Sequence, residues 1–279
     1  MPILVSPVRY QGSKRSLMSQ IKSLAPADCP RMIDAFGGSA TVVCNMNQPH
    51  RIYCESHQHV YNIIKVLCDV EPSQTMAKIR RLVRQWCLTN SNPDQYFAFR
   101  AHANQRRDPL MYYILHRHAH SNLIRFNQSG EFNTPFGNRG LIGRWEELER
   151  EIYQFYYAMQ GVRLVNMRYG DLLNKVKPSL NQNTFIYFDP PYLASGANAY
   201  DGWSVELELK LLRNLEHLTS MGVRWMLSNV VRHRHFENKL LEQWLRKNKI
   251  RVVYPQKSYA FANAQQDSHS TIEIIAMNY

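Results

Sequence analysis

The sequence predicts an α/β protein whose mainly parallel sheet is interrupted by a helical insertion. Seven short apolar runs are typical of buried strands, and helical patterns separate several of them. The middle of the chain, in contrast, has helical patterns and no strand signal. Strands that alternate with helices favour a mostly parallel sheet with both faces covered.

The strand and helix assignments follow from local hydrophobic patterns. The seven predicted strands are Met32–Phe36, Ile52–Cys54, Val162–Val165, Phe185–Phe188, Val223–Leu227, Ile250–Tyr254 and Thr271–Met277. The clearest helix covers Val205–Thr219, where five leucines share one face and Ser204 is the expected N-cap. A second helix is expected at Phe236–Lys247.

The middle of the chain is expected to be a separate domain. Between Thr75 and Arg125 there are nine Lys or Arg against two Asp or Glu, and a polar stretch with several glycines follows at Asn127–Gly143. We therefore predict a core from residues 1–60 and 161–279 and an inserted domain at 61–160. One continuous large domain is the alternative.

The composition favours a basic protein with a polyanionic partner. Thirty-four Lys and Arg against 22 Asp and Glu give the 279-residue chain a formal charge of +12. Such a surface attracts nucleic acid, although a basic soluble protein without such a partner remains the alternative. No apolar run is close to the length that spans a membrane. The apolar stretch at the start of the sequence is too short for a signal peptide.

Cysteine and histidine spacing gives no sign of a metal site. The five cysteines form no C-x-x-C pair, which fits reduced thiols in the cytoplasm better than disulfides or zinc. His116, His118 and His120 alternate without a nearby Cys or carboxylate in sequence. We interpret them as part of a basic polar surface, and we expect no metal.

The strand Phe185–Phe188 leads directly into the tetrapeptide Asp189-Pro190-Pro191-Tyr192. Open α/β sheets bind ligands at such strand ends, although a proline-stiffened turn is the purely structural alternative. The Asp189 carboxylate and the Pro190 carbonyl can accept both protons of an exocyclic amine, which directs its lone pair towards an electrophile. Pro191 stiffens the loop, and Tyr192 offers a flat face for a base. These four residues are the candidate catalytic group.

A glycine turn near the N-terminus is a candidate nucleotide site. Strand residues up to Phe36 lead into Gly37-Gly38-Ser39 and then an expected helix start, which favours a negatively charged group. Glu55 ends the second strand, where an acid can bind ribose hydroxyls. The pattern is not G-x-G-x-x-G, so a nicotinamide cofactor is disfavoured. A plain structural turn is the alternative.

Two further segments can contribute to the same site. Tyr10 and Lys14 flank a glycine and can clamp an anionic cofactor, unless they belong to a flexible terminus. Tyr169 can stack on an adenine ring and Asp171 can hydrogen-bond it, although both can equally be ordinary loop residues.

Taken in order, these motifs resemble the Dam-type DNA adenine-N6 methyltransferases of enteric bacteria and T-even phages. The resemblance spans nearly the whole chain. Its most specific part is His120–Asn127 followed by Gly130–Arg139, which contains a Gly-x-Phe-x-x-Pro-Phe-Gly stretch. Leu227-Ser228-Asn229 is similar to the phage branch.

The resemblance implies a Rossmann-like class I methyltransferase core with a mainly parallel seven-stranded sheet. It also implies that the insertion is a helical target-recognition domain with a β-hairpin. The donor would be S-adenosyl-L-methionine, and the target an adenine flipped out of double-stranded DNA, within GATC. We expect a cytoplasmic enzyme of a bacterium or phage-infected host, with no membrane and no obligate protein partner.

The expected site residues fall into two sets. The cofactor-binding set is Tyr10, Lys14, Phe36, Gly37, Gly38, Ser39, Glu55, Tyr169, Asp171 and Asp189. The DNA-binding set is Arg100, His120, Ser121, Asn122, Arg125, Asn133, Pro135 and Arg139. Arg125 and Arg139 can read guanine with paired hydrogen bonds, whereas Arg100 is expected at phosphates.

Two departures and two rival functions remain open. Some relatives have aspartate where this chain has Glu55, and relatives place Phe or Tyr, as a wedge into the helix, where it has His120. An enzyme that methylates an RNA guanine amine is one rival, and a DNA-binding regulator that has lost catalysis is the other. The sequence does not separate a stand-alone enzyme from the modification half of a restriction pair.

Overall fold

The computed structural model describes residues 3–10, 12–138, 140–141, 144–193, 203–255 and 271–279. They form two compact units. Unit 1 comprises Met1–Arg15, Gly37–Met46 and Glu55–Met167, and unit 2 comprises Ser16–Phe36, Asn47–Cys54 and Arg168–Tyr279. The predicted division into core and target-recognition domain stays a prediction, because compactness does not assign a role to either unit.

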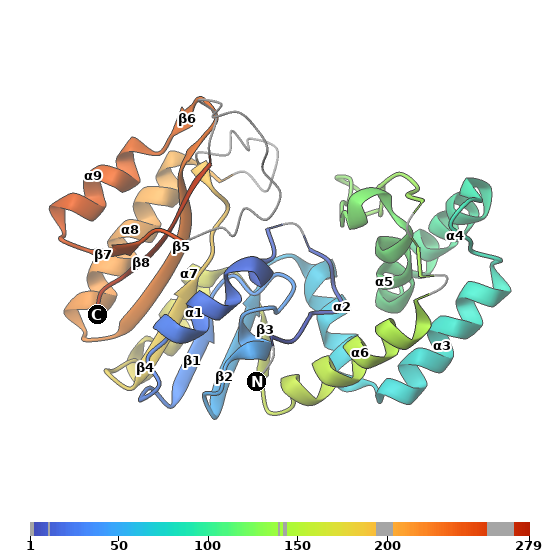
Figure 1. Ribbon diagram of the computed structural model, residues 1–279, viewed down its shortest axis with the longest axis horizontal. Helices are drawn as coiled ribbons and strands as arrows, with labels where there is room; N and C mark the ends of the chain where they lie inside the picture. The colour runs from blue at the N-terminus through green and yellow to red at the C-terminus, as the bar shows by residue number, and fades with distance from the viewer. Residues whose placement is uncertain (1–2, 11, 139, 142–143, 194–202, 256–270) are drawn as a thin grey trace. The chain divides into compact units, whose positions relative to one another are not determined.

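The strands form one mixed, mostly parallel sheet (Figure 1). Their bounds are β1 Arg31–Asp34, β2 His50–Glu55, β3 Arg163–Asn166, β4 Thr184–Phe188, β5 Arg224–His233, β6 Phe236–Glu237, β7 Arg251–Val253 and β8 Ile272–Met277. The order is β3-β2-β1-β4-β5-β8-β7, and β6 pairs with β5. Strands β1, β2, β4 and β5 are parallel, while β8 is antiparallel to both β5 and β7.

The α/β class and all seven predicted strands are confirmed, with boundary shifts. The expected count of seven is wrong by one, because the two-residue β6 adds an eighth strand against β5. Both residues of β6 are exposed, so this short strand has no buried apolar pattern by which the sequence could predict it.

Strand β4 is the centre of the unit 2 core. All five of its residues are buried, and it lies between β1 and β5 with Ile186 opposite Ile33 and Trp225. A parallel strand that is covered on both faces is expected to be apolar throughout, as Phe185–Phe188 is. The strand therefore gives the loop that follows it a rigid starting point.

The helices of unit 2 are α1 Met18–Leu24, α7 Tyr169–Val176, α8 Val205–Ser220 and α9 Lys239–Lys247. The predicted N-cap of α8 is confirmed, because the Ser204 side chain accepts the Leu207 N–H at 3.3 Å. The predicted start of α9 at Phe236 is wrong. Residues Phe236–Glu237 form β6, and the Asn238 side chain caps α9 by accepting the Leu241 N–H at 3.0 Å.

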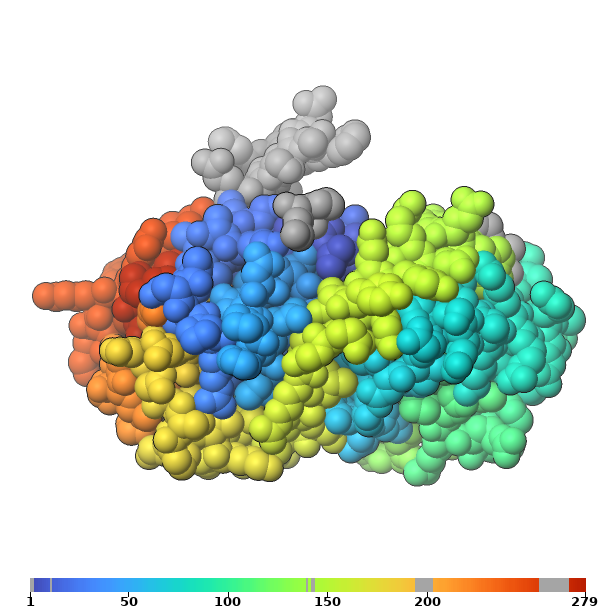
Figure 2. Space-filling view, turned by 90° about the horizontal axis from the view of Figure 1, so that it is seen from below, coloured from blue at the N-terminus to red at the C-terminus, as the bar shows by residue number. Residues whose placement is uncertain are grey.

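The helices of unit 1 are α2 Gln58–Asp69, α3 Pro72–Gln85, α4 Pro93–Arg106, α5 Pro109–His118 and α6 Trp145–Met159. Three of them begin with proline, which suits the first helical position because it needs no hydrogen bond there. Figure 2 shows α6 running beside α3, and the ion pair of Arg80 with Glu149 joins these two helices at 2.8 Å.

Residues 118–137 form the segment that we call the recognition loop. Isolated antiparallel pairs join Ala119 to Phe136 and Phe126 to Phe132. The His120 N–H donates to the Pro135 carbonyl at 2.9 Å. These are isolated bridges and not strands, and a short 3-10 turn, η3 (His120–Asn122), interrupts the first arm. The expected β-hairpin therefore stays a prediction.

The interpretation of His116 and His118 as surface residues is wrong. Their exposed fractions are 0% and 1%, whereas His120 is exposed. Helix α5 is buried along almost its whole length, so side chains on opposite sides of it are both covered. In the described part of the chain, no helix is long and apolar enough to cross a membrane, and no three acidic, His or Cys side chains are grouped to hold a metal ion.

Candidate functional site

The tetrapeptide of unit 2 leaves the carboxyl end of β4, where a sheet of this kind binds ligands. Pro190 is buried, and Asp189 and Tyr192 are half-buried. The Tyr192 hydroxyl donates to Asp189 Oδ1 at 3.0 Å. Burial, followed by the negative charge of Asp189, raises the pKa of Tyr192 above its usual value, so this hydroxyl stays protonated. Tyr192 therefore orients the Asp189 carboxylate as a hydrogen-bond donor.

An aromatic cluster lies at the ends of β1 and β4. The Phe36 ring lies 4.8 Å from that of Tyr169, and Phe188 lies 6.5 Å from Phe36 and 6.3 Å from Tyr169, between ring centroids. The structure thus brings together Phe36 and Tyr169, two predicted donor-site residues that are far apart in sequence. Asp171, another predicted donor-site residue of this unit, is exposed in the first turn of α7.

Trp203 belongs to the same cluster, although no sequence motif singles it out. Its ring lies edge-on to Phe36 at 5.8 Å, and 6.4 Å from Tyr169. The indole N–H donates to Glu208 Oε2 at 2.7 Å, and the Asn238 side chain donates to Glu208 Oε1 at 2.9 Å. Burial raises the pKa of Glu208, and these two hydrogen bonds partly oppose the shift. The buried carboxyl holds the indole in place.

The glycine turn of unit 1 is tied to the end of β2 by Glu55. The Gly38 N–H donates to Glu55 Oε2 at 2.9 Å, and the His57 N–H donates to Glu55 Oε1 at 2.6 Å. Both carboxylate oxygens of Glu55 thus accept hydrogen bonds from backbone N–H groups beside the glycine turn. The longer side chain of Glu55 is held in one orientation by the backbone on both sides.

The helix expected directly after the glycine turn is wrong. Gly38 and Ala40 have φ values of 48° and 59°, and the element between this turn and β2 is the short 3-10 turn η2 (Val43–Asn45). A left-handed residue such as Ala40 cannot continue a right-handed helix. An anionic group at this turn would therefore meet individual backbone N–H groups, without the dipole of a long helix.

Tyr10 and Lys14 lie in the same unit as the glycine turn. Lys14 is buried, and its Nζ donates to the Gly12 carbonyl at 2.8 Å. The Ser13 and Thr41 hydroxyls lie 3.2 Å apart, which joins this N-terminal segment to the glycine turn. Ser39 is buried beside Thr41, with 2.8 Å between their hydroxyls. Unit 1 thus groups Tyr10, Lys14, Gly37, Gly38, Ser39 and Glu55.

The recognition loop presents its predicted DNA residues in a fixed arrangement. His120, Ser121, Arg125 and Pro135 are exposed, and Ser121 and Asn122 have left-handed φ values of 53° and 50°. Arg125 Nε donates to the Asn133 side chain at 2.8 Å, and Arg125 Nη2 donates to the Asn133 carbonyl at 3.2 Å. Asn133 therefore orients the guanidinium across the loop. Arg139 lies outside the described residues.

Arg100 holds the recognition loop to α4. Its Nη1 donates to the Thr134 carbonyl at 3.1 Å, and the Tyr96 hydroxyl donates to the same oxygen at 2.9 Å. The Asn104 side chain accepts the Phe132 N–H at 2.8 Å. Tyr96 and Asn104 carry no sequence signal, because their partners lie about 30 to 40 residues further along the chain. A phosphate contact by Arg100 stays a prediction.

Comparisons with known proteins show what this chain is similar to. The family model for the D12 class N6 adenine-specific DNA methyltransferases matches residues 10–260. Modification methylase StsI of Streptococcus sanguinis is 30% identical over 283 residues, which cover 98% of this chain and 43% of that protein. Type II methyltransferase M.FokI of Planomicrobium okeanokoites is 30% identical over 280 residues, with the same two coverages.

A shorter relative matches over most of both chains. The DNA adenine methylase of Escherichia coli strain K12 is 25% identical over 269 residues, which cover 90% of this chain and 87% of that protein. In contrast, the chain spans less than half the length of the StsI and FokI methylases that it matches.

Proposed function

Because the chain belongs to the D12 class of N6 adenine-specific DNA methyltransferases, we propose that it methylates adenine N6 in double-stranded DNA, within GATC. The methyl donor in this proposal is S-adenosyl-L-methionine. The observation that supports the proposal most directly is Asp189-Pro190-Pro191-Tyr192 at the end of buried β4, with Asp189 oriented by Tyr192.

The chemistry follows from two oxygen acceptors on a rigid loop. The lone pair of the adenine amine is delocalised into the ring, so the amine is a poor nucleophile. Hydrogen bonds from its two protons to the Asp189 carboxylate and the Pro190 carbonyl direct that lone pair out of the ring plane. Since both acceptors are fixed by the strand and the prolines, their orientation costs little during the reaction.

The residues present fit the methyl donor. Bound S-adenosyl-L-methionine would supply an electrophilic methyl group on a sulfonium. In unit 2, Phe36 and Tyr169 offer aromatic faces for an adenine ring, with Trp203 packed against them. In unit 1, the Glu55 carboxylate is held beside Gly38 and can accept ribose hydroxyls. No step in this scheme needs a metal ion.

The target base has to leave the helix to reach such a site. We assign the DNA contacts to the recognition loop and to Arg139, which follows it in the sequence. In this proposal Arg125 and Arg139 read guanine, and Ser121, Asn122 and Pro135 lie near the bases. His120 is exposed on this loop and can stack in the space left by the flipped base. An imidazole stacks less strongly than the Phe or Tyr rings of relatives, so flipping is expected to be less favoured.

The choice of GATC rests on the resemblance of the recognition loop to Dam-type enzymes. The E. coli relative is named a DNA adenine methylase, whereas the StsI and FokI relatives are named a modification methylase and a type II methyltransferase. We place the activity in the cytoplasm of a bacterium or phage-infected host, with no protein partner required.

Sequencing of N6-methyladenine in DNA from cells that lack other adenine methylation and express this chain tests the proposal. We expect modification at GATC, and none in cells that express Asp189→Ala. Labelled donor with duplex DNA and matched RNA oligonucleotides should label only DNA. Label only in RNA would overturn the proposal, whereas methylated adenine in another DNA sequence would overturn GATC alone.

A further inference from the structure

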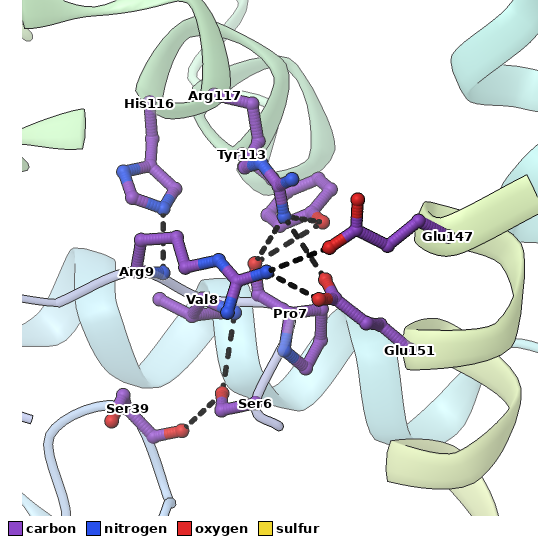
Figure 3. A network of polar contacts seen from close by, with 10 residues as sticks. All are labelled: Ser6, Pro7, Val8, Arg9, Ser39, Tyr113, His116, Arg117, Glu147 and Glu151. Carbon is purple, nitrogen blue, oxygen red and sulfur yellow. Dashed lines mark hydrogen bonds and ion pairs between the residues drawn. The ribbon is translucent and has the colours of Figure 1, made fainter. Parts of the chain in front are cut away.

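A buried polar network in unit 1 connects the first residues of the chain to helices α5 and α6. Glu151 on α6 accepts hydrogen bonds from both Arg9 and Arg117 (Figure 3). The side chains of Glu151 and Arg117 are only 7% and 8% exposed, so these charges are held in the protein interior. We call this set of contacts the Glu151 network.

The network is balanced in charge. Arg9 and Arg117 supply two positive charges, and Glu151 supplies one negative charge. Glu147, one turn earlier on α6, adds a second negative charge with its carboxylate 3.9 Å from Arg9 Nη2. Because an unpaired charge in the interior is strongly unfavourable, the buried side chains of Arg117 and Glu151 require each other as partners.

Three side chains of α5 fix the backbone just before Tyr10. The Pro7 carbonyl accepts from Arg117 Nη1 at 2.9 Å and from the Tyr113 hydroxyl at 3.3 Å. The Arg9 N–H donates to His116 Nε2 at 2.9 Å. Positions 113, 116 and 117 share one face of a helix, so this face holds residues 7–9 as a unit.

The carboxyl end of the same helix carries the recognition loop. The His118 carbonyl accepts the Gly137 N–H at 2.8 Å, and Ala119 pairs with Phe136. On the other side of the N-terminal segment, the Ser6 hydroxyl donates to the Ser39 carbonyl at 2.6 Å. Helix α5 therefore links the recognition loop to the segment that bears Tyr10 and Lys14, and this segment contacts the glycine turn.

A cavity of about 390 Å³ shows that these segments face one another. Its lining includes Arg9, Tyr10 and Ser13 from the N-terminal segment, Thr41 after the glycine turn, and Ser121 and Leu123 from the recognition loop. A change in the loop is thus within direct reach of the segment that holds the candidate donor residues.

We propose that the Glu151 network is a positioning unit that couples DNA recognition to binding of the methyl donor. The network holds Tyr10 and Lys14 in place relative to the recognition loop, so that DNA on the loop and donor in its site strengthen each other's binding. This inference rests on the proposed function. Arg9, His116, Arg117 and Glu151 act in it as positioning residues, through the segment and the helices that they hold.

The test changes Arg9, because Glu151 and Arg117 keep each other as partners when it is replaced. Arg9→Met removes the guanidinium and keeps an aliphatic side chain, while Arg9→Lys retains a charge for Glu151. Glu149→Gln is the matched control. Glu149 lies on α6 like Glu151, but its ion pair with Arg80 of α3 is outside the Glu151 network. Calorimetry then measures binding of S-adenosylhomocysteine with and without a GATC duplex.

In the unchanged protein we expect the duplex to tighten S-adenosylhomocysteine binding by about tenfold, within the usual range for coupled sites. Arg9→Met should reduce this factor to about twofold or less, Arg9→Lys should restore part of it, and Glu149→Gln should preserve it. Thermal unfolding of each variant shows that it is folded at the temperature of the measurement.

Three results would overturn the inference, and they differ from a failure of the proposed function. If the duplex still tightened S-adenosylhomocysteine binding to Arg9→Met by the same factor, the network would have only a structural role, even if this variant were less stable. Weaker duplex binding with a smaller salt dependence and unchanged coupling would make Arg9 a phosphate contact. Binding of both ligands without coupling in the unchanged protein would also contradict it. If the unchanged protein binds neither ligand, the proposed function itself fails.

Discussion

The two units fix their candidate residues by different physical means. In unit 2, Asp189 follows a strand that is buried between two parallel neighbours, so the fold of the backbone places it. In unit 1, Arg9 is held by His116 and Glu151, which lie 107 and 142 residues away in sequence. In unit 1, side-chain hydrogen bonds and charges therefore fix the position of a candidate residue, whereas in unit 2 the sheet does so. Changes to the two units should therefore have different consequences.

The largest expected effect is on catalysis in unit 2. Asp189→Ala removes one of two acceptors for the target amine and should lower kcat by about 10³-fold, equivalent to about 4 kcal/mol. Because β4 is held by apolar burial, the free energy of unfolding should change by less than about 1 kcal/mol. Methylation rates on a saturating duplex and thermal unfolding of the same preparation measure the two quantities.

One conservative variant, Tyr192→Phe, sharpens this prediction. Tyr192→Phe removes only the hydroxyl that donates to Asp189 Oδ1, so its rate should fall less than that of Asp189→Ala. If Asp189→Ala methylated DNA at the rate of the unchanged protein, the loop after β4 would not be the catalytic loop.

Acid should affect unit 1 before it affects β4. Burial, followed by the charge of Arg117, lowers the pKa of His116 to about 3 and that of His118 to about 4. The unfolded chain takes up protons near the ordinary pKa of 6.5, which the folded state resists. Stability from these groups is therefore complete above pH 6.5 and is lost as the pH falls towards 4 and 3.

The two histidines together should cost about 3 kcal/mol at pH 5.5, since each contributes about 1.4 kcal/mol per pH unit. Hydrogen exchange should show α5 losing protection at a higher pH than β4. His116→Gln keeps an acceptor for the Arg9 N–H and should reduce the pH dependence. Equal loss of protection in α5 and β4 would contradict the proposed difference between the units.

The parts of the fold that the sequence predicted depend on neighbouring residues. Phe185–Phe188 is apolar without interruption, and Ser204 stands directly before an amphipathic pattern, so β4 and the α8 cap were found. The prediction of a helix after Gly38 is wrong because Ala40 adopts a left-handed conformation. Alanine rarely has this conformation, so the sequence does not indicate it.

The parts that were missed depend on distant residues. Trp203 joins Phe36 and Tyr169 only after folding, and its anchor Glu208 looks like a solvated position on α8. The burial of His116 follows from Pro7 and Arg9 on one side of α5 and from α2, α3 and α4, which pack against this helix. No local sequence pattern encodes these contacts. Site residues at strand ends can thus be predicted from sequence, whereas polar networks between segments cannot.

Gly137→Ala should have an intermediate effect, confined to the recognition loop. A Cβ at Gly137 would lie 2.6 Å from the Ala119 carbonyl oxygen and 2.8 Å from the His120 nitrogen, so the backbone has to shift. We expect about 2 kcal/mol of destabilisation and weaker duplex binding, with donor binding unchanged. Gly170→Ala in α7 is the control for stability, because its Cβ would meet only Lys210 at 3.9 Å. A larger loss of stability in Gly170→Ala would reverse the comparison.

The smallest expected effect concerns Asn133. It distinguishes a role in orienting Arg125 from a direct contact of Asn133 with DNA. Asn133→Ala removes the oxygen that accepts Arg125 Nε at 2.8 Å, so the guanidinium gains rotamer freedom that DNA binding must then restrict. We expect about 1 kcal/mol less discrimination between a GATC duplex and one altered at a single guanine. The reason is that a bidentate contact depends on a fixed guanidinium. An equal loss on both duplexes, with a lower salt dependence, would instead show that Asn133 contacts the DNA backbone, and loop orientation would no longer explain recognition in unit 1.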